Sequence, residues 1–162
     1  MSEEPRFVSV GPEHARALAI LFERNSTPAV TESFDPFPLV ATEARRIALA
    51  PRQDGYYAMA CGEELLGLSM LRGFDEGYEI PSFGIFVDHA SQGRGIGRRL
   101  TVWTIDQARL RGCPAVRLSV YADNSAARSL YASLGFHEQE RQAVERGGRP
   151  AEKLVMRLDL GA

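Results

Sequence analysis

Apolar residues recur along this chain with two different periods, which separate the expected strands from the expected helices. Val116, Leu118 and Val120 alternate with polar residues, as in a strand with one buried face. Ile96 and Leu100 lie about one helical turn apart and begin a longer run with that spacing. The alternating pattern predicts about six or seven strands, at residues 6–10, 56–61, 65–71, 78–87, 115–121, 136–146 and 154–160. The helical pattern predicts about four helices, at residues 13–24, 42–49, 96–111 and 126–134.

The order of these segments predicts the fold class. Helices are interspersed among the strands, and a short turn at residues 62–64 joins two neighbouring strands as a hairpin. We therefore expect a mixed α/β fold, with a single sheet flanked by helices. The chain has 162 residues, enough for one sizeable core and too few for two ordinary ones, so we expect one domain over residues 1–162.

Two places depart from the regular patterns. Residues 25–38 contain three prolines, with Phe34 and Phe37 among polar residues, so we expect no regular helix there. This segment is predicted either as a lid or substrate-side wall, or as an ordered loop that buries its two phenylalanines. Pro81 interrupts the strand expected at residues 78–87, which indicates an edge strand, a bulge or a late start.

Composition narrows the classes of partner. The chain carries 19 basic and 21 acidic residues, a net charge of −2, without a long basic run, so we expect no nucleic-acid partner. It has no apolar run of membrane-spanning length and no signal-peptide pattern, so we expect a cytoplasmic protein without a membrane partner. Its three histidines are scattered and its two cysteines lack a CxxC pair, so we expect no metal site. The sequence allows a homodimer.

Residues 92–97, which we call the glycine loop, read Gln-Gly-Arg-Gly-Ile-Gly between an apolar strand and a helix. Glycines lack the Cβ atoms that keep a ligand away from the backbone, and the first N–H groups of a helix have no partners within it. This order predicts an anion site, with a flexible surface turn as the alternative. The loop lacks the lysine of a nucleoside-triphosphate site and the glycine spacing of a dinucleotide site, so we exclude both.

A second motif lies downstream. The thirteen residues 124–136 are similar to the pattern N-x-x-A-x-x-L-Y-x-x-x-G-F, and the glycine loop is similar to [RQ]-x-x-G-x-[GA]. Both patterns are typical of the GNAT superfamily of acyl-CoA-dependent N-acetyltransferases. The chain resembles this family most strongly from residue 78 to residue 136. The resemblance implies a GNAT-like fold.

The resemblance also implies acetyl-CoA as the cofactor. The N–H groups of the glycine loop are suited to its pyrophosphate, and Arg94, Arg98 or Arg99 would add bonds to phosphates unless they only form a solvated helix face. In the family, two central strands splay apart and the pantetheine arm pairs with their free edges. The implied cofactor-binding residues are Ile85, Phe86, Val87, Gln92, Gly93, Arg94, Gly95, Ile96, Gly97, Asn124 and Tyr131.

Two residues are candidates for catalysis. The family pattern makes Tyr131 the general acid that gives a proton to the departing thiolate. Glu79 is our first choice as general base, because alternation along residues 78–87 would place it on the side of Val87; a plain surface glutamate is the alternative. Three other acidic residues are candidates for binding a cationic acceptor, namely Glu32, Asp75 and Glu76.

The resemblance leaves the acceptor open. We expect a primary amine, with a small molecule favoured over a protein. The family's ribosomal-protein and N-terminal acetyltransferases usually carry an arginine at a strand end where this chain has residues 121–123, Tyr-Ala-Asp. The alternatives are a protein N-terminus or lysine as acceptor, or a non-catalytic acyl-CoA-binding or regulatory domain.

Overall fold

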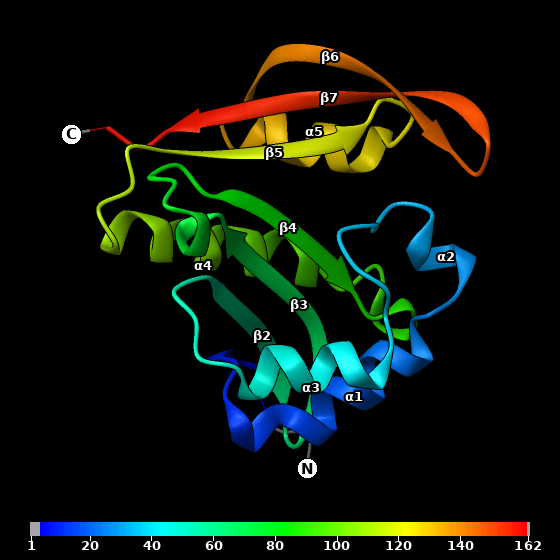
Figure 1. The fold of residues 1–162 in the computed structure, drawn as a ribbon, viewed down its shortest axis with the longest axis vertical. Helices are drawn as coiled ribbons and strands as arrows, with labels where there is room; N and C mark the ends of the chain where they lie inside the picture. Colours follow the sequence, from blue (N-terminus) through cyan, green and yellow to red (C-terminus); the bar gives the residue numbers. More distant parts are fainter. Residues whose placement is uncertain (1–3, 162) are drawn as a thin grey trace.

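One sheet of seven strands organises the computed structural model, which describes residues 4–161 (Figure 1). The strand order is β1-β2-β3-β4-β5-β7-β6, and every neighbouring pair is antiparallel except β4 and β5. The strands are β1 (Arg6–Ser9), β2 (Gly55–Cys61), β3 (Glu64–Arg72), β4 (Ser82–Val87), β5 (Ala115–Tyr121), β6 (His137–Arg146) and β7 (Arg149–Asp159). The mixed α/β class predicted from the sequence is confirmed.

Five α-helices accompany the sheet, where the sequence predicted about four. They are α1 (Ala15–Arg24), α2 (Pro28–Thr31), α3 (Ala41–Leu49), α4 (Ile96–Leu110) and α5 (Ser125–Ser133). The additional helix is α2, a single turn within residues 25–38. Pro28 stands at its first position, where a missing N–H costs no hydrogen bond, so proline starts this turn rather than preventing it.

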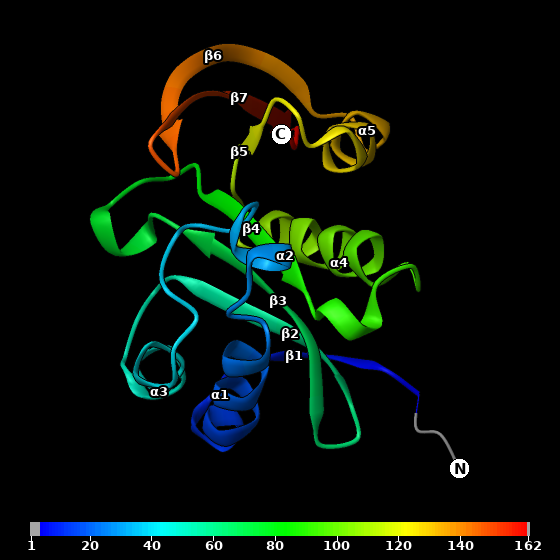
Figure 2. The ribbon, with the colours of Figure 1, turned by 90° about the vertical axis from the view of Figure 1, so that its right-hand side faces the viewer.

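The helices cover both faces of the sheet (Figure 2). Buried residues of α1 and α3, such as Phe22 and Ile47, form one core with β2, β3 and Phe86 of β4. On the other face, Ile105 of α4 and Tyr131 of α5 pack with Phe83 and with the apolar side of β5. Each core arises because one stripe of a helix and one face of the sheet leave water together. No helix within residues 4–161 is long and apolar enough to cross a membrane.

The two parallel strands at the centre of the sheet diverge. Their register holds a single pair, Ser82 with Arg117, reinforced by a 3.0 Å hydrogen bond from the Arg117 N–H to the Pro81 carbonyl. Beyond that pair, β4 bonds only to β3 and β5 bonds only to β7. We call the resulting V-shaped gap the β4–β5 opening. It leaves backbone groups on the facing edges of both strands available to a ligand.

One strand begins later than the pattern suggested. β4 starts at Ser82, so Tyr78 to Pro81 lie in a bend before the strand and outside its alternation. Proline cannot donate to a sheet ladder, which explains the late start. The last strand differs in the opposite direction, because β7 already begins at Arg149.

Candidate active site

The glycine loop leads from the end of β4 into α4. Gly93 and Gly95 have positive φ angles of 79° and 74°, a region that favours glycine. A Cβ atom on either residue would meet nothing within 4 Å, so the space in front of the loop is open. The conformation and the open space are both what a backbone anion site requires.

Four backbone N–H groups at this helix start have no acceptor. The first hydrogen bond of α4 runs from the N–H of Arg99 to the carbonyl of Gly95, at 3.1 Å. Among the described residues, none accepts a hydrogen bond from the N–H groups of residues 95–98. They are unpaired donors at the positive end of the helix dipole, so they can bind a phosphate group.

A buried polar network fixes the residues that lead into the loop. The Asp88 carboxylate, 4% exposed, accepts hydrogen bonds from Arg24 Nε at 2.8 Å and Asn25 Nδ2 at 2.9 Å. Asn25 Oδ1 in turn accepts from the backbone N–H of His89 at 2.8 Å. Although burial would raise the pKa of Asp88, these hydrogen bonds hold it below its usual value. The end of α1 is therefore bonded directly to Asp88 and His89, which lead into the glycine loop.

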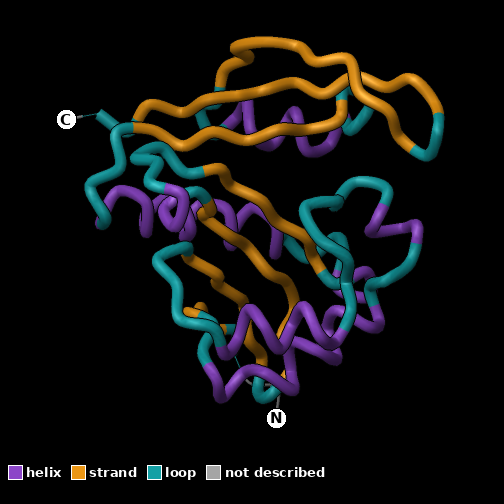
Figure 3. Tube along the Cα trace, viewed as in Figure 1, coloured by secondary structure: helices purple, strands orange, loops and turns teal. Residues whose placement is uncertain are grey.

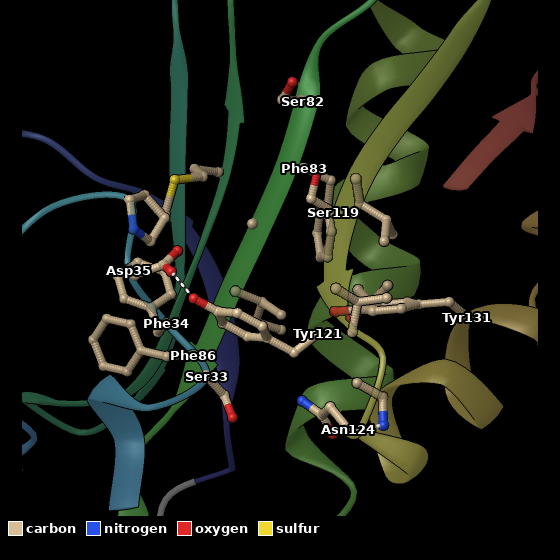
Figure 4. Close-up of a pocket in the computed structure, with 18 of the residues that line it drawn as sticks. Ser33, Phe34, Asp35, Ser82, Phe83, Phe86, Ser119, Tyr121, Asn124 and Tyr131 are labelled. Carbon is tan, nitrogen blue, oxygen red and sulfur yellow. Dashed lines mark hydrogen bonds between the residues drawn. The ribbon is translucent and has the colours of Figure 1, made fainter. Parts of the chain in front are cut away.

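A cavity of about 1010 Å³ follows the β4–β5 opening. It is lined by β4 from Ser82 to Val87, by the end of β5, by α5, and by residues 33–36 of the loop before α3 (Figure 4). That loop is mostly irregular apart from α2 (Figure 3). Phe34 is buried against Phe86, Phe37 is only partly buried, and residues 33–36 line the cavity. The role of residues 25–38 as a lid or substrate-side wall stays a prediction.

Tyr131 projects from α5 into this region. Its ring is buried and meets Phe83 and Phe136 edge-on, at centroid distances of 6.2 Å and 5.7 Å. Within residues 4–161 the Tyr131 hydroxyl has no hydrogen-bond partner, and the side chain lines the cavity. Burial raises the pKa of Tyr131 to about 12, so at neutral pH the phenol keeps its proton and can donate it.

Asn124 and the arginines near the loop have distinct positions. Asn124 is the N-cap of α5, where Oδ1 accepts a 3.2 Å hydrogen bond from the Ala127 N–H, and it also lines the cavity. Arg98 bonds to Ser133 of α5, and Arg99 lies over the Phe7 ring. Among the described residues Arg94 has no partner, so it is the arginine most available to a bound phosphate.

Comparison with known proteins identifies the family. The acetyltransferase (GNAT) family model matches residues 18–136, which include both motifs. N-alpha-acetyltransferase RimI of Mycobacterium tuberculosis is 35% identical over 129 residues, and the match covers 78% of each protein. The chain belongs to the GNAT acetyltransferase family.

Other GNAT proteins match over different lengths. The [ribosomal protein bS18]-alanine N-acetyltransferase of Salmonella typhimurium is 47% identical over 60 residues, which cover 37% of this chain and 40% of that enzyme. The match thus spans less than half of that relative. A structure of ribosomal L7/L12 alpha-N-protein acetyltransferase in complex with coenzyme A aligns with a TM-score of 0.78 at 18% identity, over 96% of this chain and 93% of that one. That structural match shows a shared GNAT fold.

The structure gathers most of the residues predicted for the GNAT cofactor site. Those that line the cavity are Ile85, Phe86, Val87, Gln92, Gly97, Asn124 and Tyr131. Gly93, Arg94, Gly95 and Ile96 belong to the adjoining loop and helix start. Phe86 differs in orientation from its neighbours, because it faces the α1 side of the sheet while Ile85 faces the α4 side.

The placement of Glu79 from strand alternation is wrong, because β4 starts three residues after it. Glu79 is exposed and is not among the residues that line the cavity. Its role as general base stays a prediction. Of the other acidic candidates, Glu76 lines the cavity, whereas Asp75 accepts hydrogen bonds from the N–H groups of Gln53 and Asp54.

Sequence reasoning missed a cluster at the mouth of the opening. Tyr121 reaches from the end of β5 to Asp35, where its hydroxyl donates a 2.5 Å hydrogen bond to the carboxylate (Figure 4). Lys153 of β7 approaches the same carboxylate. The only signal in the sequence was Asp35, an acidic residue between Phe34 and Phe37 in a loop predicted as a possible substrate-side wall. Its partners lie more than eighty residues away along the chain.

Proposed function

We propose that this protein transfers an acetyl group from acetyl-CoA to a primary amine, and that its acceptor is the N-terminal α-amine of a peptide. The observation that carries the proposal is the β4–β5 opening, which has unpartnered N–H groups at one end and the Tyr131 hydroxyl beside it. Acetyl-CoA supplies an activated acetyl thioester. The protein supplies binding, orientation and a proton.

The residues present fit coenzyme A. The N–H groups of residues 95–98 and the open space before Gly93 and Gly95 suit a pyrophosphate, and Arg94 suits a further phosphate. The free edges of β4 and β5 offer donors and acceptors to the amide groups of a pantetheine arm, as a sheet edge does to an added strand. GNAT proteins use acetyl-CoA, and the L7/L12 enzyme was solved with coenzyme A bound.

Tyr131 is the proposed general acid. A departing thiolate needs a proton, and a buried phenol with a pKa of about 12 holds one at its hydroxyl across the physiological range. A protein that only bound acyl-CoA would have no use for an unpartnered hydroxyl at this position. This supports an enzyme over a non-catalytic binding domain.

The relatives change the preferred acceptor. The sequence alone favoured a small-molecule amine. However, the relative that matches 78% of the chain is named an N-alpha-acetyltransferase, the bS18 enzyme is named for an alanine of a ribosomal protein, and the L7/L12 enzyme is named an alpha-N-protein acetyltransferase. A cavity of about 1010 Å³ leaves room for the first residues of a peptide beside the cofactor arm. We therefore propose a peptide N-terminus as the acceptor.

An acceptor screen tests this function. Thiol release from acetyl-CoA is followed with peptides that differ in their first residue and, in parallel, with a polyamine, an amino sugar and free amino acids. Mass spectrometry then identifies the acetylated nitrogen. We expect turnover with peptides, at the α-amine. Turnover with small amines alone would overturn the acceptor, and coenzyme A binding without turnover of any amine would overturn the enzymatic function.

A further inference from the structure

Three side chains from distant parts of the chain meet at the mouth of the opening. The Asp35 carboxylate accepts a 2.5 Å hydrogen bond from the Tyr121 hydroxyl, and both of its oxygens lie 3.2 Å from Lys153 Nζ. Tyr121 and Lys153 are cross-strand partners of β5 and β7, so both project from the same face of the sheet, on the β5 side of the opening. All three residues line the cavity that contains Tyr131.

The two side chains that contact Asp35 differ in how easily another group can replace them. The Tyr121 side chain is buried, and burial together with the Asp35 carboxylate raises the pKa of Tyr121 to about 12, so it stays a hydrogen-bond donor. The Asp35 side chain, by contrast, is 45% exposed and that of Lys153 is 22% exposed. An ion pair this open to water contributes little stability, and another cation can replace the lysine.

The position of Asp35 does not depend on Lys153. The preceding residue, Phe34, is buried, and its ring lies 4.9 Å from that of Phe86. Arg146 holds the loop a second time, through the backbone carbonyl of Glu32. The carboxylate therefore stays at the mouth of the opening when the lysine moves away.

We propose that the Asp35 carboxylate binds the ammonium group of the acceptor. Lys153 competes for this carboxylate and is displaced when the acceptor binds. An α-amino group has a pKa of about 8, so most acceptor molecules arrive as cations at neutral pH. An ionised carboxylate has about four lone-pair sites, and Tyr121 uses one of them. Displacement of Lys153 frees the others for an ammonium group. This inference rests on the proposed function.

Two variants test the proposal, because their expected changes in KM have opposite signs. Asp35→Asn removes the charge that attracts the ammonium, so the KM for the best acceptor should rise about tenfold. Lys153→Met keeps an apolar stem against the Tyr121 ring but removes the competitor, so KM should fall about threefold. If the cluster only tethered the loop, both substitutions would loosen it and both would raise KM. That result would overturn the proposal, as would an unchanged KM in Asp35→Asn.

A control variant separates the effect of anchoring the loop from the effect of the Asp35 charge. Arg146→Gln removes the contacts with the Glu32 carbonyl, the Asp123 carboxylate and the Tyr121 ring, but it leaves Asp35 and its charge in place, so its KM should change less than that of Asp35→Asn. An equal increase in both variants would contradict docking.

Wild-type turnover in the same assay tests the proposed function separately. Calorimetric binding of a peptide and of its des-amino analogue, with coenzyme A present, repeats the comparison without turnover. We expect Asp35→Asn to weaken the amino peptide alone; equal loss for both peptides would overturn the proposal.

Discussion

The two sides of the β4–β5 opening are built in different ways. The cofactor side consists of residues 82–97 and residues 124–131, and its main device is backbone geometry: four free N–H groups, two glycines with positive φ, and one exposed strand edge. The acceptor side consists of side chains from Asp35, Tyr121 and Lys153, which meet only after the chain has folded.

This difference explains which residues on each side can be substituted without loss of binding. A backbone anion site needs glycine at fixed positions and a helix start, and it accepts the same cofactor whatever the neighbouring side chains are. An acceptor site made of side chains on a loop and two strand ends can change one residue at a time. The strand end Tyr121-Ala122-Asp123 is an example, because it departs from the arginine-containing strand end expected of the family's ribosomal-protein and N-terminal acetyltransferases, while the glycine loop follows the family pattern.

The largest effect is expected on the cofactor side. Gly95→Asp places a carboxylate among the free N–H groups and forces a positive φ of 74° on a residue with a Cβ atom. Repulsion of the pyrophosphate should raise the Kd of coenzyme A at least about 100-fold, since about 1.4 kcal/mol corresponds to a factor of ten. Isothermal titration calorimetry measures it. Gly147→Asp is the matched control, because Gly147 also has a positive φ and open space but lies in the turn between β6 and β7. Equal loss in the control, or tight binding in Gly95→Asp, would contradict the pyrophosphate assignment.

The second-largest effect is expected at Tyr131, and it separates the rate of acetyl transfer from the binding of coenzyme A. Tyr131→Phe removes the proton donor and keeps the ring contacts with Phe83 and Phe136, so kcat should fall about 100-fold while the Kd of coenzyme A stays the same. Stopped-flow thiol release and calorimetry give the two values. Because burial raises the pKa of Tyr131 to about 12, this proton is lost only near that pH, and loss of the acid should not lower wild-type activity between about pH 8 and 10. Unchanged turnover in Tyr131→Phe would show that another group is the acid.

The sequence predicts the elements of the proposed cofactor side well, because their signals are local. Strand β5 occupies the predicted residues 115–121, and α4 ends one residue before the predicted Arg111. Both elements combine a clear hydrophobic period with a definite terminator, and the glycine loop between strand and helix contains its own geometry. Family membership could therefore be predicted from the resemblance of short segments, and most of the residues proposed for the cofactor line one cavity or its adjoining loop.

The acceptor side could not be predicted in this way. The apolar residues around Pro81 continue the strand pattern, but whether a residue belongs to β4 depends on a hydrogen-bond partner in β3, which a local period does not contain. Asp35 has no recognisable role until β5 and β7 bring Tyr121 and Lys153 to it. Glu79 was chosen through that strand pattern, and its expected position failed with it.

An intermediate effect is expected where the end of α1 is bonded to the residues that lead into the glycine loop. Asn25 caps the end of α1 and is bonded to both Asp88 and the His89 N–H, so Asn25→Ala leaves a buried carboxylate and a part-buried N–H without this partner. The free energy of unfolding should fall by about 1–3 kcal/mol, and the Kd of coenzyme A should rise about threefold as the glycine loop loses its anchor. Urea denaturation and calorimetry measure the two changes. The exposed neighbour Ser26→Ala is the control, expected to change neither value. A loss of stability with an unchanged Kd would show that the anchor does not reach the loop.

The smallest effect is expected at Glu79. Its side chain is exposed and lies outside the cavity lining, so Glu79→Gln should change kcat/KM by less than about twofold, within the range of ordinary surface substitutions. Glu76→Gln is the matched comparison, because Glu76 lies three residues earlier, at the end of the short 3-10 turn Phe74–Glu76, and does line the cavity; its effect should exceed that of Glu79→Gln and fall mainly on KM. A fall of about 100-fold in Glu79→Gln, with loss of the acidic limb of the pH profile, would instead establish Glu79 as the general base. It would also show that the bend before β4 moves when acceptor binds, so that the acceptor side takes its working form only in the complex.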